Sequence, residues 1–178
     1  MGALDLCAEM IRLHEYSKIE EAMEKRICSA FIKHLNDTSL DVQTNAVKSI
    51  QKTASIINEE NLKNNIMTLS SMVIDSNKKE VRDIYSLAIR NTIQELNENS
   101  AMNTIKVVYP NLIKGLKEMK EEVKEECLDI FADFFKKFGN LLNKKNDRIN
   151  KDELMKILCE LLMIKHDGVR KKATNCLG

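Results

Sequence analysis

The sequence has very little of what interrupts helices or builds sheets. Its 178 residues include one proline and five glycines, and no stretch shows the apolar–polar alternation of a half-buried strand. No apolar run approaches the ~18 residues that a membrane-spanning helix needs. These absences argue against a β-sheet and against a membrane-embedded chain, and they favour long, unbroken helices.

An excess of one charge sign is also missing. Lysine and arginine number 28 against 27 aspartates and glutamates, which gives a formal net charge of +1. Such a balance provides no overall field to attract nucleic acid or an acidic membrane. We therefore expect neither nucleic acid nor a membrane as a partner, and no motif predicts a small-molecule substrate.

The cysteines are scattered, and no CxxC pair is present. Each cysteine falls at an apolar position of a predicted helix. This placement favours reduced thiols that pack as small hydrophobic groups in an intracellular protein, rather than a metal site or a disulfide framework. The five residues are Cys7, Cys28, Cys127, Cys159 and Cys176.

The segment 121–142 carries the clearest pattern in the chain. Counting from Val123, apolar residues follow at +4, +7, +8, +11, +12 and +15, which makes a broad stripe on one helix. The same spacing starts again at Val42, Val81 and Val169, so the anchor valines are 39, 42 and 46 residues apart. A helical unit that recurs every forty-odd residues is typical of HEAT and armadillo solenoids.

A second amphipathic helix precedes each anchor valine across a short polar turn. We therefore predict an all-α, right-handed α-solenoid of about four and a half HEAT-type helical hairpins in a single domain. The predicted units cover residues 1–16 (partial), 18–57, 59–97, 100–142 and 151–178 (truncated), with a flexible polar linker at 143–152.

Both ends of the chain fall within a predicted repeat. The first predicted helix has no partner helix before it, and the last repeat stops nine residues after Val169. We expect that both ends are cut. Apolar side chains should then be exposed at Leu6, Met10, Cys176 and Leu177.

Two local features carry further predictions. Pro110 lies inside the predicted helix before Val123, and it should kink or break that helix. A basic residue directly follows three of the anchor valines. Together with the acidic side chains of Asp37 and Glu118, these residues predict a charge ladder between repeats. The basic residues are Arg82, Lys124 and Arg170.

No catalytic or metal-binding constellation is recognisable. His14, His34 and His166 lie near predicted helix ends, without a second ligand at metal-binding spacing. Cys127 belongs to the apolar stripe, which favours core packing over a nucleophilic role. The acidic run 118–126 is best explained as the electronegative start of a helix. We therefore predict no catalytic residue, no cofactor, no metal and no enzyme activity.

The helices that begin at the anchor valines should instead present a protein-binding face. Positions +6, +9, +10 and +13 lie opposite the apolar stripe, and in solenoids of this kind that side lines the concave surface. The alternative is that this face is simply solvated. The candidate partner-binding residues are Lys48, Lys52, Leu87, Arg90, Asn91, Asp129 and Asp133.

Four segments of the sequence resemble the N-terminal HEAT repeats of the cullin-associated, neddylation-dissociated proteins. The resemblance runs from about Leu4 to Gly178 and is densest in 127–142. The segments are LDVQTNAVKSI, VRDIYSLAIRNTIQEL, ECLDIFADFFKKFGNLL and VRKKATNCLG.

The resemblance implies a scaffold that wraps a cullin lacking its ubiquitin-like modifier and promotes substrate-receptor exchange on cullin–RING ubiquitin ligases. The first repeats would embrace the cullin's C-terminal region and its RING subunit, in the cytoplasm and nucleus. Lys48, Lys52 and Arg90 would then meet acidic groups of the cullin, while Leu87 would give apolar contact.

Two other interpretations stay open at this point. The chain could belong to another HEAT scaffold, such as a nuclear-transport receptor or a phosphatase scaffold, although the uneven spacing of 39 to 46 residues argues against the very regular phosphatase type. It could also be an enzyme of unfamiliar helical fold, which would need a polar pocket that the repeat pattern does not supply.

Overall fold

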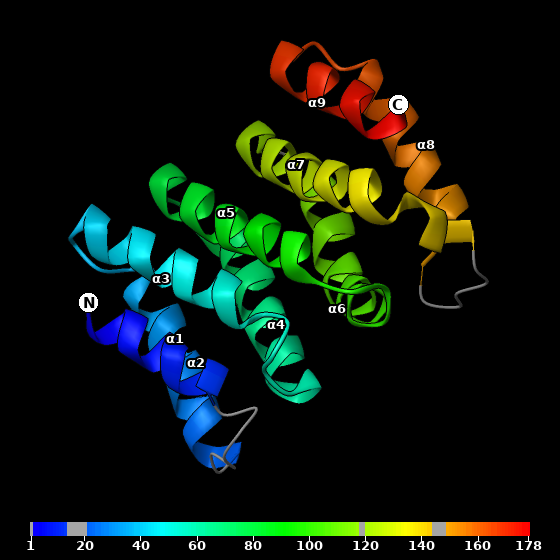
Figure 1. Cartoon of the computed structure of the whole chain (residues 1–178). Helices are drawn as coiled ribbons and strands as arrows, with labels where there is room; N and C mark the ends of the chain where they lie inside the picture. The colour runs from blue at the N-terminus through cyan, green and yellow to red at the C-terminus, as the bar shows by residue number, and fades with distance from the viewer. Residues whose placement is uncertain (1, 14–20, 118–119, 144–148) are drawn as a thin grey trace.

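A computed structural model describes residues 2–13, 21–117, 120–143 and 149–178, and within these ranges the chain forms helices and turns but no strand (Figure 1). A leading helix is followed by helical hairpins. The helices are α1 (Ala3–Leu13), α2 (Glu21–His34), α3 (Leu40–Thr53), α4 (Glu59–Asp75), α5 (Lys79–Glu95), α6 (Glu98–Lys117), α7 (Glu121–Phe138), the 3-10 turn η2 (Gly139–Asn143), α8 (Lys151–Leu162) and α9 (Asp167–Leu177).

The helices lie in two rows. In the first row α1, α3, α5, α7 and α9 follow one another, and each contacts the next (Figure 1). In the second row α2, α4, α6 and α8 do the same. Each first-row helix from α3 onward also packs against the second-row helix that precedes it in the chain. The predicted all-α solenoid is therefore confirmed.

The apolar stripe of α7 forms the centre of the core. Ile130, Phe131 and Phe134, at +7, +8 and +11 of this stripe, are all buried, because α7 contacts α5, α6 and α9 at once. The ring of Phe131 meets the ring of Tyr109 edge-on, with 6.2 Å between ring centroids, and stacks on the ring of Phe135, with 5.5 Å between centroids. A stripe that must cover three neighbours has to be broad, which explains its aromatic content.

Polar side chains at the turns cap several of the helices. At α4 the side chain of Asn58 accepts a hydrogen bond from the backbone N–H of Asn61. At α8 Asn150 accepts one from the N–H of Glu153. Such caps satisfy backbone donors that the first helical turn leaves unpaired. They also explain why these helices begin where they do.

Helix α6 and the segment after α7 contain two of the features predicted from the sequence. Helix α6 runs without a break through Pro110, which lies on an exposed side where solvent can satisfy the carbonyl that lost its N–H partner. In the predicted linker, residues 144–148 lie outside the described residues. The described end of that linker is held in place, because Ile149 is buried and Tyr109 donates a hydrogen bond to the Asn150 carbonyl at 2.7 Å.

The predicted exposure of apolar side chains holds for three of four residues. Leu6, Met10 and Leu177 are exposed. Cys176 is not exposed, because it packs in the core with its Sγ 3.2 Å from the carbonyl oxygen of Leu128. Of the five cysteines, all free thiols in the structure, Cys159 is exposed and so departs from the predicted core position.

Replacing Phe134 by alanine should destabilise the chain by about 3–5 kcal/mol, because the ring is fully buried and the cavity cannot collapse against three helices. Chemical denaturation followed by circular dichroism measures the loss. Leu87→Ala, at a side chain that is 42% exposed, is the control and should cost less than about 0.5 kcal/mol. Equal losses in the two variants would contradict the packing described above.

Candidate protein-binding face

All seven candidate residues lie on the first row of helices. Lys48 and Lys52 on α3 and Leu87 on α5 are exposed. The remaining four, on α5 and α7, are half-buried: Arg90, Asn91, Asp129 and Asp133. Three of them, Arg90, Asp129 and Asp133, reach side chains on neighbouring helices. The structure therefore divides the predicted face into an open part on α3 and α5 and a more enclosed part toward α7.

The enclosed part contains an ion pair between α5 and α7. The Nε of Arg90 donates to Oδ2 of Asp133 at 2.6 Å, and its Nη1 lies 3.8 Å from Oδ2 of Asp129. Burial alone would lower the pKa of Arg90, but these carboxylates outweigh it and raise the pKa. Arg90 and Asp133 thus neutralise each other across two repeats.

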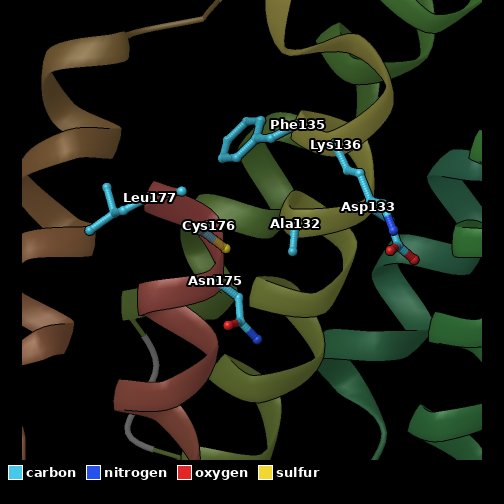
Figure 2. Close-up of a pocket in the computed structure, with 8 residues that line it drawn as sticks. Ala132, Asp133, Phe135, Lys136, Asn175, Cys176 and Leu177 are labelled. Atoms are coloured by element: carbon cyan, nitrogen blue, oxygen red, sulfur yellow. The ribbon is translucent and has the colours of Figure 1, made fainter.

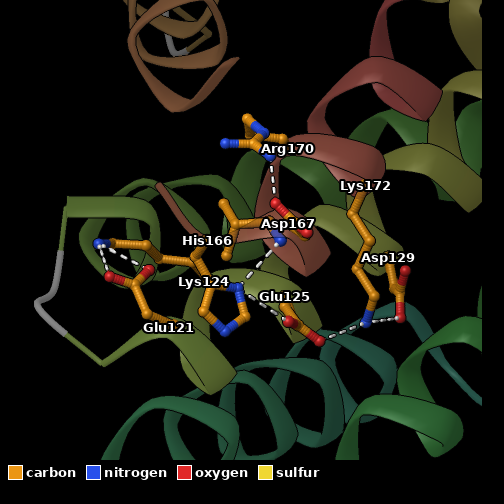
Figure 3. A network of polar contacts seen from close by, with 9 residues as sticks. Glu121, Lys124, Glu125, Asp129, His166, Asp167, Arg170 and Lys172 are labelled. Atoms are coloured by element: carbon orange, nitrogen blue, oxygen red, sulfur yellow. Dashed lines mark hydrogen bonds and ion pairs between the residues drawn. The ribbon is translucent and has the colours of Figure 1, made fainter. Parts of the chain in front are cut away.

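A second cation continues this network to α9. The Nζ of Lys172 lies 2.9 Å from Oδ2 of Asp129 and 3.2 Å from Oε2 of Glu125 (Figure 3). Here too burial opposes the charge, yet the two carboxylates raise the pKa of Lys172. We call the five residues Arg90, Asp133, Asp129, Lys172 and Glu125 the charge ladder. It links α5, α7 and α9, three helices from consecutive repeats.

Glu126 lies beside the charge ladder. Burial raises its pKa above the usual value of 4.5, and the nearby carboxylates of Asp83 and Asp129 act in the same direction. Lys172 partly opposes these effects. The ionised form of Glu126 is therefore less favoured in the folded chain than in water.

Hydrogen bonds between repeats join residues that lie 34 to 49 positions apart in the sequence. Arg90 bonds a residue 43 positions later, and Asn103 and Gln51 each bond a residue 44 positions away. This separation matches the repeat length of forty-odd residues. The polar links therefore fix one register between neighbouring repeats, as the apolar stripes do.

The residues after the anchor valines, which the sequence predicted to link the repeats, do not belong to this charge ladder. Arg82 donates to the Ser76 carbonyl at 3.0 Å, and Arg170 donates to the Ile164 carbonyl at 3.0 Å. Both side chains thus hold the turn of their own repeat. Lys124 likewise pairs within its own helix, with Glu121, and Asp37 bonds the nearby backbone N–H of Ser39, while Glu118 lies outside the described residues.

Sequence reasoning missed the role of Lys137. Its Nζ lies within hydrogen-bond distance of the carbonyl oxygens of Ile93, Gln94 and Leu96, at the end of α5. A lysine in this position satisfies carbonyls that the last helical turn leaves unpaired. In the sequence Lys137 is one lysine among several on its helix, and spacing alone does not show that it reaches the end of another helix.

Histidine gives no catalytic site among the described residues. The Nδ1 of His166 accepts a hydrogen bond from the backbone N–H of Val169 and so caps α9. The same atom lies 3.5 Å from Glu125. Because the lone pair of Nδ1 accepts this hydrogen bond, Nδ1 has no proton to donate to Glu125, and this contact is not an ion pair. His14 lies outside the described residues.

A depression of about 630 Å³ opens between α7 and the end of α9 (Figure 2). Its lining contains no histidine, serine or threonine, and burial raises the pKa of its one cysteine, Cys176, to about 12. A thiol with that pKa stays protonated and is a poor nucleophile. The lining residues are Ala132, Asp133, Phe135, Lys136, Asn175, Cys176, Leu177 and Gly178.

Neither a metal centre nor a membrane segment emerges from the part of the chain that the structure describes. No three histidine, cysteine or acidic side chains there are grouped as ligands for one ion. No helix among the described residues combines the length and apolar character needed to cross a bilayer. What the geometry offers is a long row of helix faces, which suits contact with another protein.

Comparison with known proteins agrees with this geometry. The chain is 26% identical over 180 residues to cullin-associated NEDD8-dissociated protein 1 of Arabidopsis thaliana, and 27% identical over 194 residues to the protein of that name from Dictyostelium discoideum. Both matches cover 100% of this chain. The resemblance to the cullin-associated proteins is confirmed. No protein-family model matches the sequence.

The chain spans only 14% and 15% of the length of these two relatives. Among solved structures it is similar to one from a study of tubulin recruitment by microtubule polymerases with TOG domain arrays. That match has a TM-score of 0.62 and 16% identity, and it covers 98% of this chain and 36% of the other. At such low identity the likeness shows a shared helical fold alone.

The link between Arg90 and Asp133 should contribute measurably to stability. A double-mutant cycle with Arg90→Ala and Asp133→Ala should give a coupling energy of about 0.5–1 kcal/mol, because the pair is half-buried and joins two repeats. The exposed pair Arg12–Glu9, with its Nε–Oε2 distance of 2.7 Å, is the control. Its coupling should be below about 0.5 kcal/mol. A coupling energy of zero between Arg90 and Asp133 would mean that this ion pair does not stabilise the fold.

Glu126→Gln should stabilise the chain at pH 7. Because the folded pKa of Glu126 is raised, ionising it costs folded-state free energy, and this cost begins as the pH rises above its unfolded pKa of about 4.5. The melting temperature of the variant should therefore exceed that of the parent at pH 7, and the two should converge near pH 4. Glu122→Gln, at an exposed position of the same helix, is the control. An equal gain at both pH values would mean that the charge is not the cause.

Proposed function

We propose that this chain is a cullin-binding segment of a scaffold that promotes exchange of substrate receptors on cullin–RING ubiquitin ligases. The observation that carries the proposal is the match of the whole chain to proteins named as cullin-associated and NEDD8-dissociated. The first-row helices supply a continuous surface for such a partner. No constellation for catalysis was found among the described residues, so binding is the activity that the geometry favours.

In this proposal the partner surface is the cullin's C-terminal region together with its RING subunit, and the protein acts in the cytoplasm and the nucleus. A solenoid holds a partner by many modest contacts along its length rather than at one pocket. A segment with 14% of the length of its relatives would then supply one part of a longer grip. Its own affinity should be far weaker than that of the whole scaffold.

The charges on the proposed binding face are not equally free to meet the cullin. Arg90 is already neutralised by Asp133, so reversing its charge would break an internal link as well as any external one. Lys48 pairs with no acidic group in the described part of the chain, and Lys52 is 3.7 Å from Asp5, a loose and exposed contact. These two lysines are the cations on α3 that can meet a partner's carboxylates without loss of the fold.

Binding of a purified cullin–RING complex, with and without NEDD8 attached, tests the proposal. We expect micromolar affinity for the unmodified complex and at least about tenfold weaker binding once NEDD8 is attached. Lys48→Glu with Lys52→Glu should slow association by about threefold or more at low salt, because exposed charges act chiefly on the encounter rate. Surface plasmon resonance gives both quantities.

The matched control is Lys25→Glu with Lys156→Glu, which makes the same change in net charge on the second row of helices. It should leave the association rate within about twofold of the parent. If the parent chain does not bind the unmodified complex at all, the proposed function is wrong. If both double variants slow association equally, the effect reflects net charge and the first row is not the binding face.

A further inference from the structure

Helix α1 has the same register as the other first-row helices. With position zero set one residue before Met1, Ile11 falls at +11 and is buried, as are its equivalents Thr53, Thr92 and Phe134. Ala8 falls at +8 and is buried, as are its equivalents Ile50, Ile89 and Phe131. The core side of α1 is thus fixed, and the positions that correspond to the proposed binding face can be read directly.

At three of those four positions α1 carries apolar side chains, and the fourth is Glu9. Leu6 and Leu13 are each 56% exposed, and Met10 is 41% exposed. Their spacing of four and three residues places them in one stripe along the helix. Exposed leucines in such a stripe are unfavourable in water, and a contiguous apolar patch commonly marks a site of protein contact.

The equivalent residues in later repeats show where this stripe points. Leu6 is equivalent to Lys48, Leu87 and Asp129, and Leu13 is equivalent to Ser55, Gln94 and Lys136. Apart from the half-buried Asp129, all of these are exposed. Met10 is equivalent to Lys52 and Asp133, which contact the preceding helix of their row. Leu6 and Leu13 therefore lie on the open side of the row, whereas Met10 lies at its edge.

Next to this stripe, the exposed surface of the first row is basic on α3 and apolar again on α5. On α3, the neighbour of α1, Lys48 and Lys52 are exposed, and on α5 Leu87 is 42% exposed. Packed helices lie about 8–10 Å apart, so the two apolar areas are separated by roughly 20 Å with the lysines between them. Each acidic side chain on α1 has a cation near it, because Glu9 pairs with Arg12 and Asp5 lies 3.7 Å from Lys52.

Much of the charge in the far half of the row is already paired. On α7 and α9 Asp129, Asp133 and Lys172 belong to the charge ladder, and a partner's charged group that contacts them would have to displace an existing pair. Displacing a half-buried ion pair leaves one charge unpaired, which opposes binding. The open side of α1, α3 and α5 is therefore the part of the row that can take a partner at the lowest cost.

We infer that Leu6 and Leu13 form the apolar anchor of the partner interface. The occupant is a segment of the cullin whose apolar side chains cover these leucines, whose carboxylates meet Lys48 and Lys52, and whose second apolar group covers Leu87. The choice of occupant rests on the proposed function. Apolar anchors dominate the affinity of protein interfaces, whereas exposed charges set the association rate and its salt dependence.

The test is the double variant Leu6→Ser with Leu13→Ser, measured against the unmodified cullin–RING complex at about 50 mM and about 300 mM salt. We expect the dissociation constant to rise at least about tenfold at both salt concentrations, because apolar contact is weakly screened. The effect of Lys48→Glu with Lys52→Glu should instead shrink at the higher salt. Hydrogen exchange should show slower exchange of α1 amides in the complex.

The control is Met67→Ser with Met163→Ser, which removes two exposed apolar side chains from outside the first row. It should leave the dissociation constant within about twofold of the parent. Circular dichroism melts check folding, and the single variant Leu13→Ser serves if the double variant is unfolded. If the parent chain binds the complex and the leucine variants bind it equally well, the inference is wrong and the proposed function stands. Absence of parent binding overturns both.

Discussion

The structure depends on one requirement, which is that each inner first-row helix must cover a first-row neighbour on both sides. A helix with an apolar stripe as broad as that of α7 cannot bury it against a single partner, and α5, α6 and α9 together complete the burial of Phe131 and Phe134. The same stripe starts at a valine in each repeat, so stacking extends in one dimension. An extended row of outward faces is a necessary result of this arrangement.

Polar links between repeats then decide how those faces can be used. Arg90, Asp133 and Lys172 fix the register of α5, α7 and α9, and Lys137 holds the end of α5. Charges that stabilise the stack in this way are no longer available for a partner. The row therefore has a half toward α9 in which many charges are paired with one another, and a half around Lys48 in which charges remain exposed.

The sequence alone was enough to predict much of this, for a physical reason. Burial repeats with the helical period, so the core positions of Ile130 and Phe134 follow from spacing. The pairing of Arg90 with Asp133 could not be predicted, because it depends on the angle and offset between neighbouring helices. Cys176 was expected to be exposed, since the sequence does not show how closely the end of α9 approaches α7.

The candidate site shows the same division between spacing and packing. The exposure of Lys48 and Leu87 follows from their place opposite the stripe, whereas the half-buried state of Asp129 reflects Lys172 on a different helix. The exposed leucines of α1 can be interpreted as a face that another helix covers, or as part of the partner surface. Their shared register with Lys48 and Leu87 favours the second, because a core residue would align with Ile11 instead. A partner that covers Leu6 therefore also comes within reach of α3. Because α1 packs against α3, the apolar contact at Leu6 and the charged contact at Lys48 have a fixed spacing.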